Sequence, residues 1–459
     1  MITNLYTHAV STLLFPVHES FKGHNTVAVR RCMEQSQWWD TERLRLMQLD
    51  RLRDLLSHAM TYVPYYREQL HDRGVSLDDI RSLDDLTRLP FLEKATIRAH
   101  QDALKSEKSR NLARFNTGGS SGQPLIFFIG KERISHDVAA KWRATRWWGV
   151  DIGDPEVVVW GSPIELDVQD HMRRIRDRLL RTRLLPAFEM SEEKLHHFVE
   201  VIRKVRPRML FGYPSALARI AAHAEASGTS LDDLGVRVAF VTSEKFYDDQ
   251  RECIERVFSC RAANGYGGRD AGFIAHECPD GGMHITAEDI IVETVDDAGD
   301  PVGSGRPGEI VITHLATRDY PFIRYRTGDI GVLSDERCTC GRGLPLLEEI
   351  QGRTTDFVVA RDGTVMHGLA LIYVMRDLPG ISAFKIIQES LDLIRVQVVT
   401  EGKIPSETVA TIQRGFRDRL GGDVEIRVES LQHIPPERSG KFRYVVSKVP
   451  GAASHAPTA

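Results

Sequence analysis

Two short groups of thiols and an imidazole in the second half of the sequence have the chemistry of a metal site. Cys278 and His284 form a C-x5-H pattern, and Cys338 and Cys340 form a C-x-C pattern. Thiolate and imidazole groups are soft or borderline ligands, and four of them suit a tetrahedral structural Zn²⁺. The sequence therefore predicts a zinc site within about residues 276–342, with His276 as an alternative nitrogen ligand.

The alternative is that these residues are ordinary reduced thiols and an ordinary histidine. A cysteine nucleophile is disfavoured because no triad pattern accompanies the cysteines. Six cysteines in 459 residues are too dilute for a disulfide scaffold. We interpret Cys32, Cys253 and Cys260 as simple thiols.

A second group, rich in glycine and hydroxyl side chains, could bind phosphate. Glycines let backbone N–H groups converge on an anion, and serine and threonine hydroxyls add donors. The P-loop pattern GxxxxGK[ST] is absent, and so is GxGxxG. A plain flexible loop is the alternative, and the apolar run 125–129 that follows is expected to be a strand. The residues are Thr117, Gly118, Gly119, Ser120, Ser121 and Gly122.

This loop resembles the Gly/Ser/Thr-rich motif of the adenylate-forming superfamily, which includes acyl-CoA synthetases, adenylation domains and luciferases. Four further segments resemble that family's motifs and occur in the family's order. They are 264–270 (NGYGGRD), 324–329 (RYRTGD), 352–356 (GRTTD) and 439–441 (SGK). Residues 63–67 and 211–215 are similar to the phenylacetate–CoA ligase branch, which includes members in capsular polysaccharide gene sets. The resemblance extends from about residue 40 to residue 448.

The resemblance implies a role for each matched residue. Lys441, Asp270 and Arg353 are expected to be catalytic, with Asp270 also holding Mg²⁺ as a hard oxygen ligand. The substrate pocket is expected to contain Tyr213, Glu244, Gly267 and Gly268, although Glu244 could instead cap the helix that begins near residue 247. The expected nucleotide-binding residues are Thr117, Gly118, Gly119, Ser120, Ser121, Gly122, Gly265, Tyr266, Gly267, Arg326 and Asp329.

The implied activity is ATP-dependent adenylation of a small carboxylic acid, followed by acyl transfer to CoA. Alternative acceptors are an acyl carrier protein thiol, or an amine or hydroxyl of a polysaccharide precursor. Three positions depart from the pattern common in the superfamily: Gln123, Asp270 and Thr355. They favour a different alternative, a catalytically inactive, zinc-stabilised nucleotide-binding protein. A third alternative is a kinase, which would release ADP instead of AMP.

Composition limits the partners and the location. Sixty basic and 64 acidic side chains give a formal net charge of −4, so nucleic acid is not an expected partner. No stretch of about 18 apolar residues predicts a membrane span. The apolar run 9–17 lacks the features of a secretory signal, so we expect a cytoplasmic monomer or homodimer. We interpret that run as a helix docked on its own domain, with a peripheral amphipathic anchor as the alternative.

Segment 171–183 is unusually basic. It contains Arg173, Arg174, Arg176, Arg178, Arg181 and Arg183. We interpret it as a solvated helix face. The alternative is a docking surface for an anionic partner, such as a CoA phosphate, an acidic carrier protein or a membrane surface.

Periodicity predicts the elements that must position these groups. Alternating strands and helices in the centre indicate an α/β fold with parallel pairing. We expect a large N-terminal adenylate-forming domain (1–352) with mixed and parallel sheets, a small mobile α+β C-terminal domain (353–450), and a disordered tail (451–459). The expected helices are 49–60, 191–205 and 409–420. The expected strands are 157–160, 209–211, 236–241, 290–295, 309–313, 357–360, 383–388, 394–399 and 424–428.

Overall fold

The structure is a computed structural model of the chain. It describes residues 2–116, 125–160, 176–187, 190, 192–353, 357–361, 365–367, 369–376, 378–400, 402, 404–435 and 443–449. Several predicted features lie outside these residues. They are the loop from Thr117 to Gly122 with Gln123, residues 354–356, Lys441, Arg173 and Arg174, the side chain of Arg353, and the tail 451–459.

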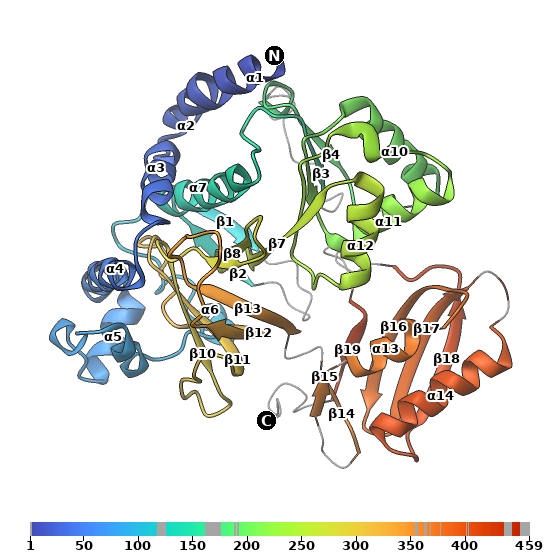
Figure 1. Cartoon of the computed structure of the whole chain (residues 1–459). Coiled ribbons are helices and arrows are strands. Elements are labelled where there is room, and N and C mark those ends of the chain that lie inside the picture. Colours follow the sequence, from blue (N-terminus) through green and yellow to red (C-terminus); the bar gives the residue numbers. More distant parts are fainter. Residues whose placement is uncertain are drawn as a thin grey trace.

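Helices dominate the N-terminal part and lie along one side of the molecule (Figure 1). The limits of α4 (Thr41–Tyr62) follow from its flanking residues. Asp40 accepts a hydrogen bond from the Arg43 backbone N–H at its start, and Val63 is extended before Pro64 at its end. The helix predicted to stop before residue 63 is therefore confirmed. The other helices here are α1 (Ile2–Ala9), α2 (Phe15–Lys22), α3 (Thr26–Ser36), α5 (Pro64–Asp72), α6 (Lys94–Ala99) and α7 (Lys131–Trp147).

Within the described residues, eleven strands form one large sheet in the order β10-β11-β12-β13-β9-β8-β7-β6-β5-β3-β4. The strands from β4 to β7 pair in parallel, and those from β7 to β10 pair antiparallel. The strands are β3 (Glu156–Val159), β4 (Thr182–Leu185), β5 (Met209–Gly212), β6 (Val238–Thr242), β7 (Arg261–Gly268), β8 (Gly272–Glu277), β9 (Met283–Ile285), β10 (Ile290–Val295), β11 (Pro307–His314), β12 (Tyr325–Ser334) and β13 (Leu346–Arg353).

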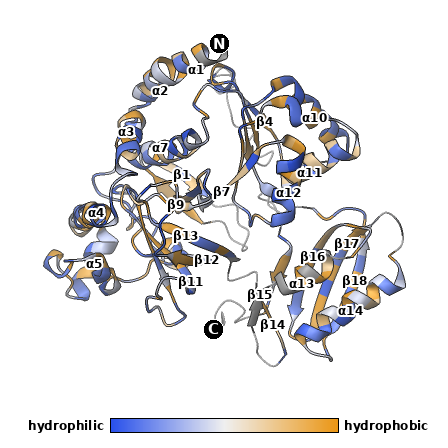
Figure 2. Cartoon of the chain, viewed as in Figure 1, coloured by the Kyte–Doolittle hydropathy of each residue, from blue (hydrophilic) through white to orange (hydrophobic). Residues whose placement is uncertain are grey.

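The parallel half has the α/β layering that its sequence predicts. Its strands are apolar, and β5 and β6 are buried along their whole length. The helices α10 (Glu192–Val205), α11 (Pro214–Ala226) and α12 (Asp248–Phe258) contribute Phe198, Leu217 and Ile254 to one core with these strands. In Figure 2 the helices α10 and α11 carry both hydrophobic and hydrophilic residues. Short 3₁₀ segments occupy Leu77–Asp79, Leu83–Arg88 and Asp232–Leu234.

A separate hydrophobic core forms from Val358 onward. It lies between a sheet of order β18-β17-β16-β19 and the helices α13 (Leu369–Arg376) and α14 (Ser406–Leu420). Its contact with the large part includes Tyr247, whose ring meets Tyr444 edge to face at 5.5 Å. The strands are β14 (Phe357–Val359), β15 (Val365–His367), β16 (Ile381–Ser390), β17 (Leu393–Thr400), β18 (Glu425–Leu431) and β19 (Val445–Ser447).

The basic segment does not form a single helix face. Residues 176–179 are helical, but Arg183 belongs to the edge strand β4. The interpretation of all six arginines as one helix face is therefore wrong for Arg183. Among the described residues, no helix is both long and apolar enough to cross a lipid bilayer.

Candidate active site and metal cluster

The carboxyl ends of β5, β6 and β7 bring several predicted site residues together. Gly212 pairs with Val241, and Thr242 pairs with Gly265, so the three strands end at one edge of the sheet. Tyr213, Glu244 and Tyr266 follow or end these strands. Ligands of open α/β sheets bind at this edge. The parallel topology therefore makes this edge the candidate active site.

Tyr213, predicted in the substrate pocket, is almost completely buried. Its ring stacks on Trp160 with 4.4 Å between the ring centroids. Trp160 follows β3, the next parallel strand, so both rings lie at the same edge. Sequence analysis did not assign a role to Trp160, although a tryptophan directly after an apolar strand was a visible signal.

Glu244 caps a helix, but not the helix that was expected. Its carboxylate accepts a hydrogen bond at 3.2 Å from the Ser215 backbone N–H, in the first turn of α11. The N-terminus of α12 instead uses Gln250, whose Oε1 accepts from the Tyr247 backbone N–H. The suggestion that Glu244 caps the helix beginning near residue 247 is therefore wrong. Ser243, beside it, has a left-handed φ of 74°, a conformation that costs energy for a non-glycine residue.

The glycines of the 264–270 motif allow close strand approach. A Cβ on Gly267 would lie 2.2 Å from the Gly272 carbonyl oxygen, and one on Gly268 would lie 2.7 Å from the Asp270 carboxylate. Only glycine fits the first of these positions without moving the backbone. Tyr266 lies in β7, and Asp270 lies in the turn that connects β7 to β8.

Tyr266 and Asp329, the residues predicted to bind adenosine, are hydrogen-bonded to each other. The Tyr266 hydroxyl donates to the Asp329 carboxylate at 2.9 Å. Tyr266 comes from β7 and Asp329 from β12, at a sequence separation of 63 residues. Asp329 also pairs through its backbone with Arg353 on β13. The fold thus brings three motifs together.

Asp270 is held by two groups from elsewhere in the chain. The Tyr325 hydroxyl donates to its carboxylate at 2.6 Å, and the Arg133 guanidinium donates to its carbonyl oxygen at 2.8 Å. Arg133 is a buried residue of α7 and was not predicted. A buried arginine is rarely found without a structural or functional partner. Arg133 therefore fixes the backbone of the predicted magnesium ligand.

The charge of Arg133 is balanced by Asp137, one helical turn away on α7. Burial acts to raise the pKa of Asp137, but Arg133 and a hydrogen bond to His314 outweigh it, so the pKa of that carboxyl is lowered. Burial and the Arg133 charge lower the pKa of His314. Asp137 is therefore ionised and His314 is neutral at pH 7. Arg133 and Asp137 form an ion pair next to the turn that contains Asp270.

Arg326, predicted to contact the nucleotide, forms an ion pair in this structure. Its Nε donates to Glu309 at 2.8 Å, and its guanidinium lies 5.2 Å from the Phe91 ring centroid. Its neighbour Tyr325 instead reaches Asp270. Adjacent residues of a strand point to opposite faces, so Tyr325 and Arg326 contact different groups.

Residues 117–124 are flanked by a two-stranded antiparallel sheet of β1 (Ala113–Asn116) and β2 (Ile126–Ile129). The strand expected over 125–129 is thus confirmed. Phe127 of β2 meets Phe322 edge to face, and Phe322 meets Tyr325 in the same way. These rings connect the flanks of the phosphate motif to the strand that carries Asp329.

The predicted zinc ligands converge in space. The ligand atoms of Cys278, His284, Cys338 and Cys340 all lie within 4.8 Å of one another. The Cys278 and Cys338 sulfurs are 3.6 Å apart, and the Cys340 sulfur is 3.2 Å from His284 Nε2. Zn–S bonds of about 2.3 Å in a tetrahedron separate two sulfurs by about 3.7 Å. These residues therefore fit a tetrahedral zinc ion.

The surroundings of His284 favour the tautomer that a metal needs. Its Nδ1 faces the Leu344 carbonyl oxygen at 3.4 Å, which leaves the Nε2 lone pair directed to the sulfurs. Burial lowers the pKa of His284 to about 4, so the ring is neutral at pH 7. Burial raises the pKa of the Cys278 thiol to about 12. Such a thiol becomes a good ligand when a cation takes the place of its proton.

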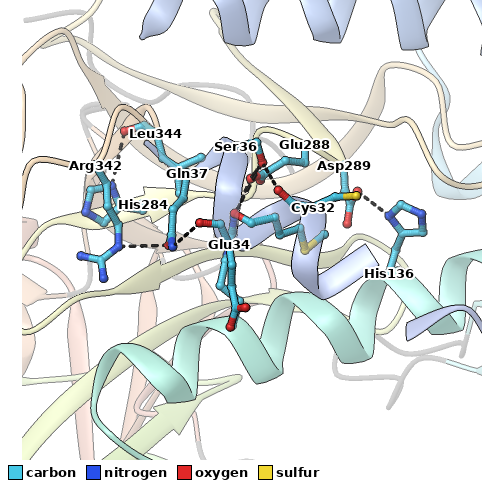
Figure 3. Close-up of polar contacts among 12 residues, drawn as sticks. Cys32, Glu34, Ser36, Gln37, His136, His284, Glu288, Asp289, Arg342 and Leu344 are labelled. Carbon is cyan, nitrogen blue, oxygen red and sulfur yellow. Dashed lines mark hydrogen bonds and ion pairs between the residues drawn. The ribbon is translucent and has the colours of Figure 1, made fainter. Parts of the chain in front are cut away.

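A second layer of side chains attaches the cluster to α3 (Figure 3). The Gln37 side-chain oxygen accepts hydrogen bonds from Trp147 Nε1 at 2.8 Å and from Arg342 Nε at 3.2 Å. The Trp147 ring packs edge to face on His284. No local sequence pattern pointed to Gln37, Trp147 or Arg342 as partners of this cluster. Gln37 and Arg342 are 305 residues apart, so no local pattern could connect them.

His276, the alternative nitrogen ligand, is outside the cluster. Its ring stacks on Phe273 and lies near Phe240, and neither nitrogen has a hydrogen-bond partner among the described residues. Burial lowers the pKa of His276 to about 3. The structure therefore places it as a neutral core residue, and Cys278, His284, Cys338 and Cys340 are the candidate ligands.

The fold is that of the adenylate-forming CoA ligases. The structure matches 2-hydroxyisobutyryl-CoA ligase in the post-adenylation state with a TM-score of 0.71 at 20% identity, over 89% of this chain and 90% of that chain. The same ligase in the thioesterification state gives a TM-score of 0.61, over 90% and 91% of the two chains.

Sequence relatives agree with this class. The chain is 28% identical to phenylacetate–coenzyme A ligase of Thermus thermophilus over 70% of this chain and 72% of that one. It is 22% identical to protein CapK of Staphylococcus aureus over 88% and 89% of the two chains. Residues 358–448 match the family model of the CapK C-terminal domain. The recognition of the superfamily and branch, the fold class and the enzyme class predicted from the motifs are confirmed.

Proposed function

We propose that this protein adenylates a carboxylic acid with ATP and then transfers the acyl group to CoA. The observation that carries the proposal is the convergence of Tyr266 with Asp329 and of Asp270 with Tyr325 at the carboxyl edge of the parallel strands. Residues from two separate family motifs meet there, and Asp329 pairs through its backbone with Arg353 of a third, on a fold shared with CoA ligases.

In the first half-reaction, a carboxylate oxygen of the acid attacks the α-phosphorus of ATP, and the bond to pyrophosphate breaks. The Tyr266 ring packs on adenine, and Asp329 exchanges its bond with Tyr266 for bonds from the ribose hydroxyls. Lys441 brings a point charge to the α-phosphate as negative charge develops. Asp270, held in place by Arg133 and Tyr325, would hold Mg²⁺, and that ion would supply positive charge to offset the phosphates.

In the second half-reaction, the CoA thiolate attacks the acyl carbonyl carbon, and AMP leaves. We propose that residues 353–450 rotate between the two steps, so that Lys441 serves only the first. In support, the structure is more similar to the post-adenylation state of 2-hydroxyisobutyryl-CoA ligase than to its thioesterification state. The Tyr247–Tyr444 contact would be exchanged during that rotation.

We propose a structural role for zinc in the Cys/His cluster. Its four protein ligands fill a tetrahedron and leave no open position for a substrate. The ligands connect β8, β9 and the segment between β12 and β13, so a bound ion would join parts of the antiparallel half. Elemental analysis of the purified protein should give about one zinc per chain, as one such site requires. Folded protein without zinc would refute the site.

Exchange of labelled pyrophosphate into ATP, measured with aryl, short-chain and fatty acids, tests the first half-reaction. We expect one acid class to support exchange, and CoA to convert it into thioester with release of AMP. Exchange followed by transfer only to a carrier protein, amine or hydroxyl would change the acceptor and leave the adenylation proposal intact. Tight ATP binding without exchange for any acid would indicate an inactive nucleotide-binding protein. Release of ADP would indicate a kinase.

A further inference from the structure

The N-terminal segment 2–22 is a helical rod with an exposed apolar side. It consists of α1, a π-helical turn (Val10–Leu14) and α2, and the residues at both junctions have helical backbone angles. The rod ends at Gly23, which is left-handed. In Figure 1 it lies at the outer edge of the molecule, beside β4 and α7.

The inner side of the rod is attached to the large domain by specific contacts. Thr7 donates a hydrogen bond to Asp154 at 2.9 Å, and the Phe15 ring meets Trp142 edge to face at 5.1 Å. Val10 is buried and lies so close to Gly153 that a Cβ there would be 2.7 Å away. The rod is thus docked on its own domain, and its orientation is set by packing.

The outer side of the rod presents what we call the apolar stripe. Leu5 is 74% exposed, Leu13 68%, Val17 56% and Phe21 91%. They recur at multiples of four residues, and the intervening Ala9 is also exposed. In a regular α-helix, each step of four residues shifts the side chain by about 40° around the helix axis. The π turn holds more residues per turn and reverses part of this drift, which keeps the stripe on one side.

Basic side chains lie next to the rod. The Tyr6 hydroxyl donates to the Leu179 carbonyl oxygen at 2.9 Å, and the Arg181 guanidinium lies 4.0 Å from the Tyr6 ring centroid. This contact brings segment 176–183 against α1. Arg178 and Arg183 of that segment are exposed. Lys22, an exposed residue in the last turn of α2, adds a further cation to the rod. Burial and the charges of Lys22 and Arg176 lower the pKa of His18 on the same helix.

We propose that the apolar stripe and Arg178, Arg183 and Lys22 form a docking surface for an anionic phospholipid membrane. Large exposed apolar side chains beside cationic ones are the composition of an interfacial helix. The chain carries a net charge of −4, so the local basic character is not a property of the whole protein. A second copy docked across a two-fold axis would bring the same basic groups toward each other, which is unfavourable. This inference is independent of the proposed ligase activity.

Co-sedimentation of the full chain with vesicles tests the surface. The probes are vesicles of phosphatidylcholine alone and vesicles that also contain phosphatidylglycerol. We expect binding to the anionic vesicles that weakens with added salt. The double variant Leu13→Glu/Phe21→Glu should bind at least about ten-fold more weakly than the unchanged protein, because charge replaces the apolar contact. Arg178→Gln/Arg183→Gln should weaken binding about 30-fold, because it removes two charges that contribute about 1 kcal/mol each.

Leu46→Glu is the matched control, since Leu46 is 62% exposed on α4 and lies outside the stripe. It should bind as the unchanged protein does. Circular dichroism checks folding, and Phe21→Ser alone provides a milder change if the double variant is unstable. Pyrophosphate exchange without vesicles should be the same in all variants.

Three outcomes would overturn the proposal. The first is no binding to anionic vesicles at low salt. The second is binding that survives the stripe variants, because the arginines alone would then account for it. The third is a dimer in sedimentation velocity that Leu13→Glu/Phe21→Glu dissociates, because the stripe would then be a contact between copies of the chain.

Discussion

The Cys/His cluster and the candidate nucleotide site lie on the same large sheet but are built differently. The cluster is self-contained, because its four ligand atoms face one another within the antiparallel half. The nucleotide site lies where β7 meets the ends of β12 and β13, and its polar groups form pairs such as Tyr266–Asp329. Such pairs can exchange partners when a ligand binds, whereas the cluster has no comparable freedom. We therefore expect changes in the cluster to affect stability and changes at the nucleotide site to affect catalysis.

The largest effect on catalysis is expected from Lys441→Ala. Loss of a charge positioned on the transition state should lower pyrophosphate exchange by about 100- to 1,000-fold. Thioester formation from preformed acyl-AMP should remain largely intact, because Lys441 does not serve that step. The matched control is Lys448→Ala, which removes an exposed lysine paired with Glu389. An equal loss in both half-reactions would contradict the proposed rotation.

Cys278→Ser should give the largest effect on stability. Removing one ligand should release the zinc and lower the melting temperature by about 10 °C, because metal-binding energy is folding energy. Zinc content and thermal unfolding measure the two effects. Cys32→Ser is the control, since Cys32 is an exposed free thiol. If the variant keeps its zinc and its melting temperature, the cluster does not stabilise the fold.

Tyr266→Phe is expected to have a smaller effect, confined to catalysis. The ring remains while its hydrogen bond to Asp329 is lost. Because Asp329 must otherwise give up this bond when the ribose binds, the KM for ATP should fall about five- to ten-fold. The melting temperature should change little. A double-mutant cycle with Asp329→Asn measures the coupling of the two side chains. A fall in stability with an unchanged KM would place this pair with the structural cluster instead.

The smallest effect concerns the connection between α7 and the turn before β10. His136 Nδ1 lies 2.6 Å from Asp289 (Figure 3). Burial acts to lower the pKa of His136, but Asp289 outweighs it and raises the pKa. Burial acts to raise the pKa of Asp289, but His136 outweighs it and lowers the pKa.

The direction of the pH effect on stability follows from the raised pKa of His136 and the lowered pKa of Asp289. The His136 contribution to stability is complete below its unfolded pKa of about 6.5 and is lost as pH rises through the higher folded value. The Asp289 contribution is present above about pH 4 and is lost as pH falls. His136→Asn should therefore lower the melting temperature by about 1–2 °C at pH 6 and less at pH 9. Identical pH profiles for the two proteins would exclude a charged pair.

Local patterns predicted many of the elements correctly. The strands β3, β5 and β10, the helices α4, α10 and α14, and the C-terminal strands β14, β16, β17 and β18 follow from apolar periodicity and flanking turn residues, whereas β15 and β19 were not predicted. β12 and β13 were not predicted as strands. Their sequences are polar, and two register shifts interrupt their pairing. The division into domains 1–352 and 353–450 remains a prediction, although a separate core does begin at Val358.

The sequence by itself determined which chemical groups are available for the candidate sites, because residue types and their spacing are local properties of the chain. It predicted four candidate metal ligands and the candidate site residues Asp270, Tyr266 and Asp329, and it placed the motifs in the order of a known superfamily. Tertiary structure alone decided which groups meet. Gln37 reaches Arg342, Arg133 holds Asp270, and Glu244 caps α11 instead of α12. These contacts join segments between 29 and 305 residues apart. The packing of the whole chain specifies these contacts, so a local sequence pattern cannot predict them.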